Sequence, residues 1–227
     1  MIEAVELSKT YGRFRVLDRI SLSVGVGEFV GIFGRNGAGK TTFLKILSLL
    51  LKPSDGRLTI HGMSPDRHAN SILRSLGMVS HQVYLYNDLT SRENLRFYAR
   101  IYDVDHVEST IDRLLEKVGL ASRAKEPIRR FSRGMLQRLS IARVLLHQPS
   151  ILLMDEPYTG LDQKACTFLD GILSEYHQLG NTVIMVSHDI AHAVTLARRA
   201  VVFDRGQIAL DSKTPLQDLD GIRAFVA

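Results

Sequence analysis

The stretch Gly34-Arg35-Asn36-Gly37-Ala38-Gly39-Lys40-Thr41 places three glycines ahead of a lysine and a hydroxyl side chain. A strand-like apolar run, Phe29–Phe33, precedes it, and a helix-like run, Thr42–Leu51, follows it. A glycine-rich turn in this context directs its backbone N–H groups inward at the positive end of the helix, where phosphates bind. Lys40 would supply a cation for the β- and γ-phosphates, and Thr41 a hydroxyl for Mg²⁺. A chance glycine-rich turn would not need such neighbours, so we expect residues Gly34 to Thr42 to bind a nucleoside triphosphate.

A second strand-like run ends in two carboxylates. Ile151–Met154 is apolar and is followed by Asp155 and Glu156. Ligands of α/β proteins bind at the carboxyl ends of parallel strands, so Asp155 would reach a Mg²⁺ ion there. Glu156 would accept a proton from the water that attacks the γ-phosphate. A strand leading into an acidic turn is common by itself, but downstream of a phosphate loop it indicates ATP hydrolysis.

The periodicity of the chain changes twice along its length. Residues 1–33 contain short apolar or alternating runs separated by glycines, which predicts strands joined by turns. Residues 90–147 show helical spacing instead. The expected helices there are Thr90–Ile101, Val107–Val118 and Gly134–Leu146.

The apolar runs at 151–154 and 183–186 then predict strands covered on both faces. A crossover helix over residues 161–179 and a closing hairpin over 201–210 complete the pattern, which is typical of an α/β fold with a mainly parallel sheet. We expect one domain, with its core in residues 1–88 and 148–227 and a helical subdomain inserted at 89–147.

The bulk properties are those of a globular chain. Its 227 residues are 45% hydrophobic and 23% charged, and no apolar run approaches the ~20 residues of a membrane-spanning helix. The single cysteine, Cys166, and the absence of an export-like N-terminus lead us to expect a soluble, cytoplasmic protein. The net charge of +5 fits a solvated face and phosphate-binding residues, or a surface near anionic lipids, without selecting between them.

Five further segments occur in the order found in one family. These are Tyr11, Gln82, the stretch Phe131-Ser132-Arg133-Gly134-Met135, Gly160-Leu161-Asp162 and Ser187-His188-Asp189. With the phosphate loop and the acidic strand, they resemble the ATP-binding subunits of ABC (ATP-binding cassette) transporters over nearly the whole chain. The resemblance implies a P-loop NTPase fold with an N-terminal antiparallel β subdomain and an inserted helical subdomain. It also implies ATP and Mg²⁺ as cofactors.

The resemblance assigns a role to each segment. Tyr11 would stack on adenine, or would otherwise pack as a turn residue on the sheet. Gln82 would ligate Mg²⁺ and sense the γ-phosphate, and His188 would donate a hydrogen bond to that phosphate. Asp162 would contact ATP across a dimer interface, unless it only caps the next helix.

The stretch Phe131–Met135 is similar to the family's Leu-Ser-Gly-Gly-Gln signature, which closes over ATP held by the other subunit. Ser132 and Gly134 would bind the γ-phosphate in trans, and Ser132 would also cap its own helix. Phe131, Arg133 and Met135 depart from the family's Leu, Gly and Gln.

Three classes of function fit a chain of this kind: a transporter ATPase, a soluble ABC ATPase acting on DNA or ribosomes, and another P-loop phosphotransferase. The chain shows neither the second cassette nor the long coiled coil usual in the soluble class, and a phosphotransferase would not need Ser132 or His188. We therefore expect a transporter ATPase, a homodimer at the cytoplasmic face of the cell membrane. Separate permease subunits would dock on Val83–Tyr86, unless these side chains belong to the subdomain core. We expect no nucleic acid and no direct contact with cargo.

Three stretches are similar to the haem-exporter ATP-binding subunit of bacterial cytochrome c maturation. They are residues 80–90, 93–100 and 131–139. Exporters of drugs, lipids or polysaccharide share parts of them, so this resemblance favours haem export and leaves the other cargoes open.

Overall fold

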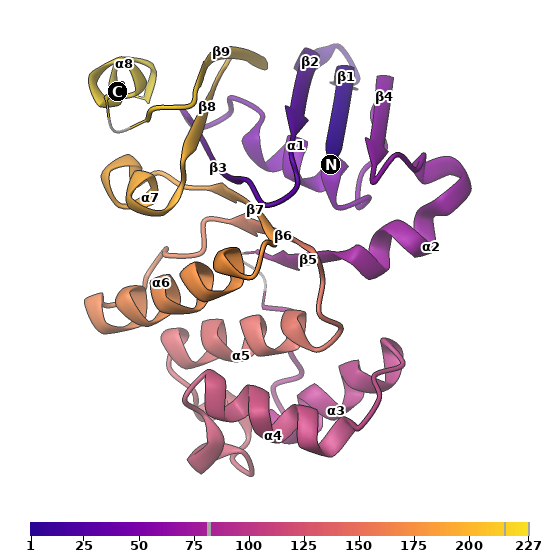
Figure 1. Cartoon of the computed structure of the whole chain (residues 1–227), viewed down its shortest axis with the longest axis vertical. Helices are drawn as coiled ribbons and strands as arrows, with labels where there is room; N and C mark the ends of the chain where they lie inside the picture. Colours follow the sequence, from indigo (N-terminus) through magenta and orange to yellow (C-terminus); the bar gives the residue numbers. More distant parts are fainter. Residues whose placement is uncertain (81–82, 216, 227) are drawn as a thin grey trace.

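The computed structural model describes residues 1–80, 83–215 and 217–226, and it consists of two sheets with helices around them (Figure 1). A three-stranded antiparallel sheet has the order β2-β1-β4. Its strands are β1 (Ile2–Tyr11), β2 (Phe14–Val24) and β4 (Asp55–Ile60). The N-terminal antiparallel β subdomain expected from the resemblance is therefore present.

The second sheet has six strands in the order β5-β6-β7-β3-β8-β9. The first five are parallel, and β9 closes the edge in an antiparallel hairpin with β8. In chain order these strands are β3 (Phe29–Gly34), β5 (Leu76–Val79), β6 (Ile151–Asp155), β7 (Thr182–Val186), β8 (Arg199–Asp204) and β9 (Gln207–Ser212). Every residue of β3, β6 and β7 is buried, which explains why these strands are almost uniformly apolar.

Alternate residues of the parallel strands point into two separate hydrophobic cores. One core contains Ile32, Leu153 and Val186 together with α1 (Lys40–Leu47) and the three-stranded sheet. The other core contains Met154 and Met185 together with the helices that follow β5 in the chain. Helices α1 and α5 therefore cover opposite faces of the six-stranded sheet.

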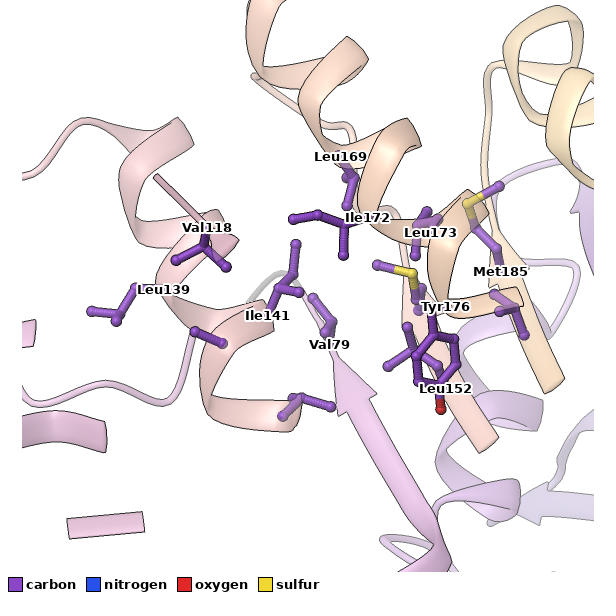
Figure 2. Packing of buried hydrophobic residues seen from close by; sticks show 14 of the residues in the cluster. Val79, Val118, Leu139, Ile141, Leu152, Leu169, Ile172, Leu173, Tyr176 and Met185 are labelled. Atoms are coloured by element: carbon purple, nitrogen blue, oxygen red, sulfur yellow. The ribbon is translucent and has the colours of Figure 1, made fainter. Parts of the chain in front are cut away.

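The second core joins the sheet to the helical segment. Its helices are α3 (Ser91–Ile101), α4 (Val107–Lys117), α5 (Arg133–Leu145), α6 (Gln163–Gln178), α7 (Ile190–Leu196) and α8 (Leu219–Val226). Two short 3-10 helices, Ala121–Arg123 and Ile128–Arg130, lie between α4 and α5. Figure 2 shows Leu169 and Ile172 of α6 pointing toward Ile141 of α5 and Val79 of β5. Helices α3 to α5 form the part of the molecule drawn at the bottom of Figure 1.

The expected helices of this segment are confirmed to within a few residues. Helix α3 begins where the sequence indicated, because Thr90 and Glu93 form a reciprocal capping box. The division into a core and a subdomain at residues 89 and 147 stays a prediction. Among the described helices, none is both long and apolar enough to cross a membrane.

Several elements were not expected from the sequence, among them helices α2 (Pro65–Ser75), α7 and α8 and strand β5. Helix α2 is mostly polar, and Ile72 is its only buried residue, so no apolar run marks it in the sequence. Strand β5 is only four residues long and contains Gly77, which lowers strand propensity. A methyl group on Gly77 would lie 2.3 Å from Val144 Cγ1 of α5, so the glycine allows α5 to approach the strand closely.

Candidate nucleotide-binding site

The turn between β3 and α1 can be built only with glycines at two of its positions. Gly34 and Gly39 both have positive φ, 141° and 101°. A Cβ on Gly34 would lie 2.1 Å from the Phe203 carbonyl oxygen, and one on Gly39 would lie 2.6 Å from Leu17 Cδ2. Gly39 is also the N-cap of α1 and has no side chain to cap it. The first backbone N–H groups of α1 are thus available to a ligand, as an anion site at a helix N-terminus requires.

Lys40 is held inside the turn. Its Nζ donates hydrogen bonds to the carbonyl oxygens of Gly34 at 2.6 Å and Arg35 at 2.8 Å, and the residue is 6% exposed. Burial lowers the pKa of the Lys40 ammonium, while Glu156 and Asp155 act in the opposite direction. The cation is therefore positioned in the loop before any phosphate arrives.

Thr41 and Asp155 meet across the turn, at the carboxyl end of β6. The Thr41 hydroxyl donates to Asp155 Oδ1 at 3.2 Å. Burial raises the pKa of the Asp155 carboxyl, and the bond from Thr41 and the nearby lysines oppose that rise. Two hard oxygen donors therefore lie side by side, which is the donor chemistry Mg²⁺ prefers.

Glu156 and His188 form a pair beside these donors. Nε2 of His188 lies 3.1 Å from Oε1 of Glu156, and the His188 backbone N–H donates to Oε2 at 3.2 Å. Burial raises the pKa of Glu156 to about 7, and the neighbouring Asp155 adds to the rise. Burial and the charge of Lys40 lower the pKa of His188. A carboxylate that titrates near neutrality is suited to act as a general base.

The backbone of Glu156 is unusual. Its φ is +53°, a left-handed conformation rare for a residue with a long side chain. Its N–H donates to the Val186 carbonyl oxygen of β7 at 3.0 Å, which fixes the turn after β6. Strained non-glycine residues of this kind cluster at functional sites.

These groups surround one cavity of about 180 Å³. Its lining consists of Val16, Asn36, Gly37, Ala38, Gly39, Lys40, Thr41, Thr42, Glu156 and His188. Most of the residues expected to act on ATP are therefore brought together, with Asp155 bonded to one of them. Val16 is the lining residue that the sequence did not indicate. A single apolar residue in a strand gives no sequence pattern that indicates binding. In the structure, the Val16 carbonyl oxygen would lie 2.8 Å from a Cβ on Gly39, which places Val16 beside the turn.

Ser132, Gly134 and Asp162 form a second group, at the start of α5 and α6. The Ser132 hydroxyl accepts from Met135 N–H at 3.3 Å, and Asp162 accepts from Ala165 N–H at 2.8 Å. Both residues therefore cap helices, as the sequence allowed. A Cβ on Gly134 would lie 3.3 Å from Ala165 Cβ, so the two helix starts are packed together. The structure does not bring this group into the cavity around Lys40.

Arg133, one of the residues that depart from the family signature, packs against the segment that precedes α6. A methyl group on Gly160 would lie 2.8 Å from Nε of Arg133. The Arg133 side chain therefore lies across the backbone of the segment that leads to Asp162. The signature stretch and the start of α6 are in contact within one chain.

Of the two remaining expected site residues, the structure describes only Tyr11, which lies apart from both groups. Tyr11 is exposed at the end of β1, with Lys9 Nζ 5.4 Å from its ring centroid, and its predicted stacking on adenine stays a prediction. Gln82, the expected Mg²⁺ ligand, lies outside the described residues.

Comparison with known proteins identifies the family. Residues 17–159 match the family model described as ABC transporter. The chain is 35% identical to a linearmycin resistance ATP-binding protein of Bacillus subtilis (strain 168) over 95% of this chain and 70% of that protein. It is also 35% identical to a bacitracin transport ATP-binding protein of Bacillus licheniformis, over 92% and 68% of the two chains.

A solved dimeric ATP-binding cassette in a post-hydrolysis state, bound to ADP and Pi, superposes with a TM-score of 0.86 at 28% identity. The match covers 93% of this chain and 98% of that one. The phosphate loop, the carboxylates after β6 and these matches agree with one another. The chain therefore belongs to the ATP-binding subunits of ABC transporters and is an ATP hydrolase of that family.

Proposed function

We propose that this chain hydrolyses ATP with Glu156 as general base and His188 as donor to the γ-phosphate. The observation that carries the proposal is the contact between these two side chains beside the loop that holds Lys40. A water between Glu156 and the γ-phosphate would lose its proton to a carboxylate whose pKa is already raised by burial. Neutral His188 would donate from Nε2 to the charge that develops on the phosphate.

The nucleotide would be held by the turn between Gly34 and Thr42, with Tyr11 against the adenine. Mg²⁺ would be bound through the Thr41 hydroxyl and Asp155, with Gln82 as a further ligand. The adjacent oxygen atoms of Thr41 and Asp155 support this assignment. The ion would neutralise charge on the phosphates, which is its usual contribution to phosphoryl transfer.

A second copy of the chain would complete each site. The cavity of about 180 Å³ is lined by the phosphate loop, Val16, Glu156 and His188, and none of the described residues expected to act in trans lines it. Ser132, Gly134 and Asp162 lie together at the start of α5 and α6, outside that cavity. In a homodimer this group would cover the ATP held by the partner's loop, and hydrolysis would release the two chains.

Glu156→Gln tests the catalytic assignment. The variant should bind ATP and Mg²⁺ as the wild-type chain does, lose nearly all turnover, and form a dimer that ATP stabilises. Turnover and size-exclusion chromatography with ATP measure the two effects. Normal hydrolysis by this variant would remove Glu156 from the role of base.

Permease subunits would dock on an aromatic surface next to α3, defined by Tyr84, Tyr86, Phe97 and Ile101. All four side chains are exposed, and the rings of Tyr86 and Phe97 pack edge to face at 4.8 Å. Leu85, between the two tyrosines, packs against the core instead. This patch would place the chain at the cytoplasmic face of the membrane, without contact with the cargo itself.

The cargo we propose is an antibiotic or a related drug-like compound, carried outward. The support is the naming of relatives for linearmycin resistance, bacitracin transport, daunorubicin resistance and lantibiotic transport. An arginine transport protein is also among them, at 34% identity. None of these names refers to haem, so the haem export expected from residues 80–90, 93–100 and 131–139 gains no support from the relatives.

Purification of the tagged chain from gently solubilised membranes tests this part of the proposal. Mass spectrometry identifies the copurified permease, and an absorbance scan detects haem. A multi-span exporter without haem is the expected result. Copurified haem and cytochrome c maturation proteins would replace the cargo assignment, and no membrane partner at all would favour a soluble ABC ATPase.

A further inference from the structure

Besides the Glu156–His188 contact, a second set of contacts joins the turn after β6 to helix α7. The Tyr158 hydroxyl donates to Asp170 Oδ1 at 2.7 Å, and His192 Nε2 lies 2.9 Å from that same oxygen. The Tyr158 and His192 rings pack edge to face, with centroids 4.5 Å apart. One carboxylate oxygen of α6 thus joins a residue of the turn after β6 to a residue of α7.

Tyr158 and His192 lie shortly after Glu156 and His188 in the sequence. Tyr158 comes two residues after Glu156, and His192 comes four residues after His188, on helix α7, whose N-cap is Asp189. The His192 backbone N–H also donates to the N-cap Asp189 at 3.0 Å. The side chains of Asp170 and His192 are only about a quarter exposed, at 26% and 24%. The network is therefore partly shielded from water and continuous with both catalytic segments.

Both segments need support from their surroundings. Glu156 is held at a positive φ, and such conformations persist only where neighbouring contacts enforce them. The turn that follows it contains two backbone bonds, Thr159 N–H to the Glu156 carbonyl at 3.3 Å and Leu161 N–H to the Tyr158 carbonyl at 3.1 Å. Tyr158 anchors this turn to α6 through Asp170.

His188 depends on α7 in the same way. Its side chain is half exposed, at 52%, so packing does little to fix it. Helix α7 has only seven residues, and a helix that short takes its orientation from tertiary contacts. The bond from His192 to Asp170 is such a contact, one turn after His188.

We infer that Tyr158, Asp170 and His192 are positioning residues that hold His188 and Glu156 in register for hydrolysis. Asp170 accepts from the tyrosine hydroxyl and from the Nε2–H of His192, which fixes the imidazole with its proton on that nitrogen. Burial and Asp170 raise the pKa of Tyr158, so the phenol keeps the proton it donates. The inference rests on the proposed roles of Glu156 and His188. It adds that their alignment is set from the side of α6 and not only by the nucleotide.

Turnover and nucleotide affinity separate a positioning role from simple packing. The lining of the cavity, as far as the described residues define it, does not include Tyr158, Asp170 or His192. His192→Ala should therefore lower kcat about tenfold, as small misplacements of reacting groups do, and leave ATP affinity unchanged. His192→Gln should restore most of the turnover, because its amide donates a hydrogen bond from nearly the same place. Tyr158→Phe should fall between the two.

His177 provides a matched control. It is also a half-buried histidine, it lies on α6, and its Nε2 is 2.9 Å from the Gly27 carbonyl oxygen, away from the two segments. His177→Ala should keep wild-type kcat. A loss of kcat in His177→Ala equal to that in His192→Ala would identify general destabilisation and overturn the inference.

A His188→Ala background completes the test. If His192 acts through His188, adding His192→Ala should cost no further turnover, because mutations in one network are not additive. A full additional tenfold loss would overturn the inference. Wild-type turnover in His188→Ala alone would instead refute the proposed function. An inactive His188→Ala beside a fully active His192→Ala would refute only the positioning role.

Discussion

Among single residues, Lys40 is notable because its charged side chain is almost fully buried. A buried ammonium is costly unless it is paired or hydrogen-bonded, and Nζ satisfies this through the carbonyl oxygens of Gly34 and Arg35. Phosphate oxygens would replace or supplement these neutral acceptors with charged ones.

Lys40→Ala should therefore lose at least tenfold in ATP affinity, since hydrogen bonds between charged groups are worth about 1.5–3 kcal/mol. Titration with a fluorescent ATP analogue measures the loss. Lys52→Ala, which removes an exposed lysine beyond α1, should bind the analogue as wild type does. Equal affinity of the Lys40 variant and wild type would mean that the loop does not hold the phosphates.

The raised pKa of Glu156 predicts how the activity depends on pH. Its pKa is raised from 4.5 to about 7, so the carboxyl is protonated below that pH and cannot accept a proton from water. kcat/KM should therefore rise with pH between 6 and 8, with a midpoint near 7, because this parameter reports groups of the free enzyme. Burial and the charge of Lys40 lower the pKa of His188, so this histidine loses its proton at a lower pH than Glu156 does. A profile that is flat from pH 6 to pH 8 would contradict the assignment.

Among the elements, β5 and α5 show how a glycine joins the helical segment to the sheet. Gly77→Ala would place a methyl group 2.3 Å from Val144 Cγ1 and 2.8 Å from Pro149 Cγ. Overpacking of this kind costs about 1–3 kcal/mol, so the free energy of unfolding should fall by that amount. Gly171→Ala on α6, where a Cβ meets nothing within 4 Å, should instead raise it by up to about 1 kcal/mol. Urea unfolding of both variants measures these changes. A change of the same sign in the two free energies of unfolding would contradict the prediction.

The elements also show what the sequence can and cannot predict. Helix α3 was predictable because Thr90 and Glu93 cap it locally, and β6 because an apolar run leads into charged residues. Strand β5 was not, because Gly77 is explained only by the approach of Val144 from a distant helix. The phosphate loop is likewise local in sequence, whereas the contact of His192 with Asp170 spans 22 residues and has no local pattern. The candidate site residues could therefore be chosen from the order of motifs along the chain. The residues that contact their segments, such as Asp170 and His192, became visible only in the structure.

For the whole molecule, the placement of Ser132 makes a prediction about assembly. If the start of α5 covers ATP on a partner chain, Ser132→Arg should prevent ATP-driven dimerisation and leave ATP binding by the monomer intact. Light scattering with and without ATP, in the Glu156→Gln background, measures the first effect. Ser132→Thr keeps the cap hydroxyl and should still dimerise. Dimers of the arginine variant at wild-type affinity would place the interface elsewhere.

The location of α1 and α5 on opposite faces of the sheet has a genetic consequence. If the start of α5 covers ATP on the partner chain, Lys40→Ala would disable the loop and Ser132→Arg would disable the start of α5, so neither homodimer would work. A mixed dimer of the two would combine the sound loop of one chain with the sound helix of the other, and would keep one intact site out of two. Two alleles that are inactive alone should therefore complement each other when coexpressed, whereas a single allele that carries both changes should be rescued by neither.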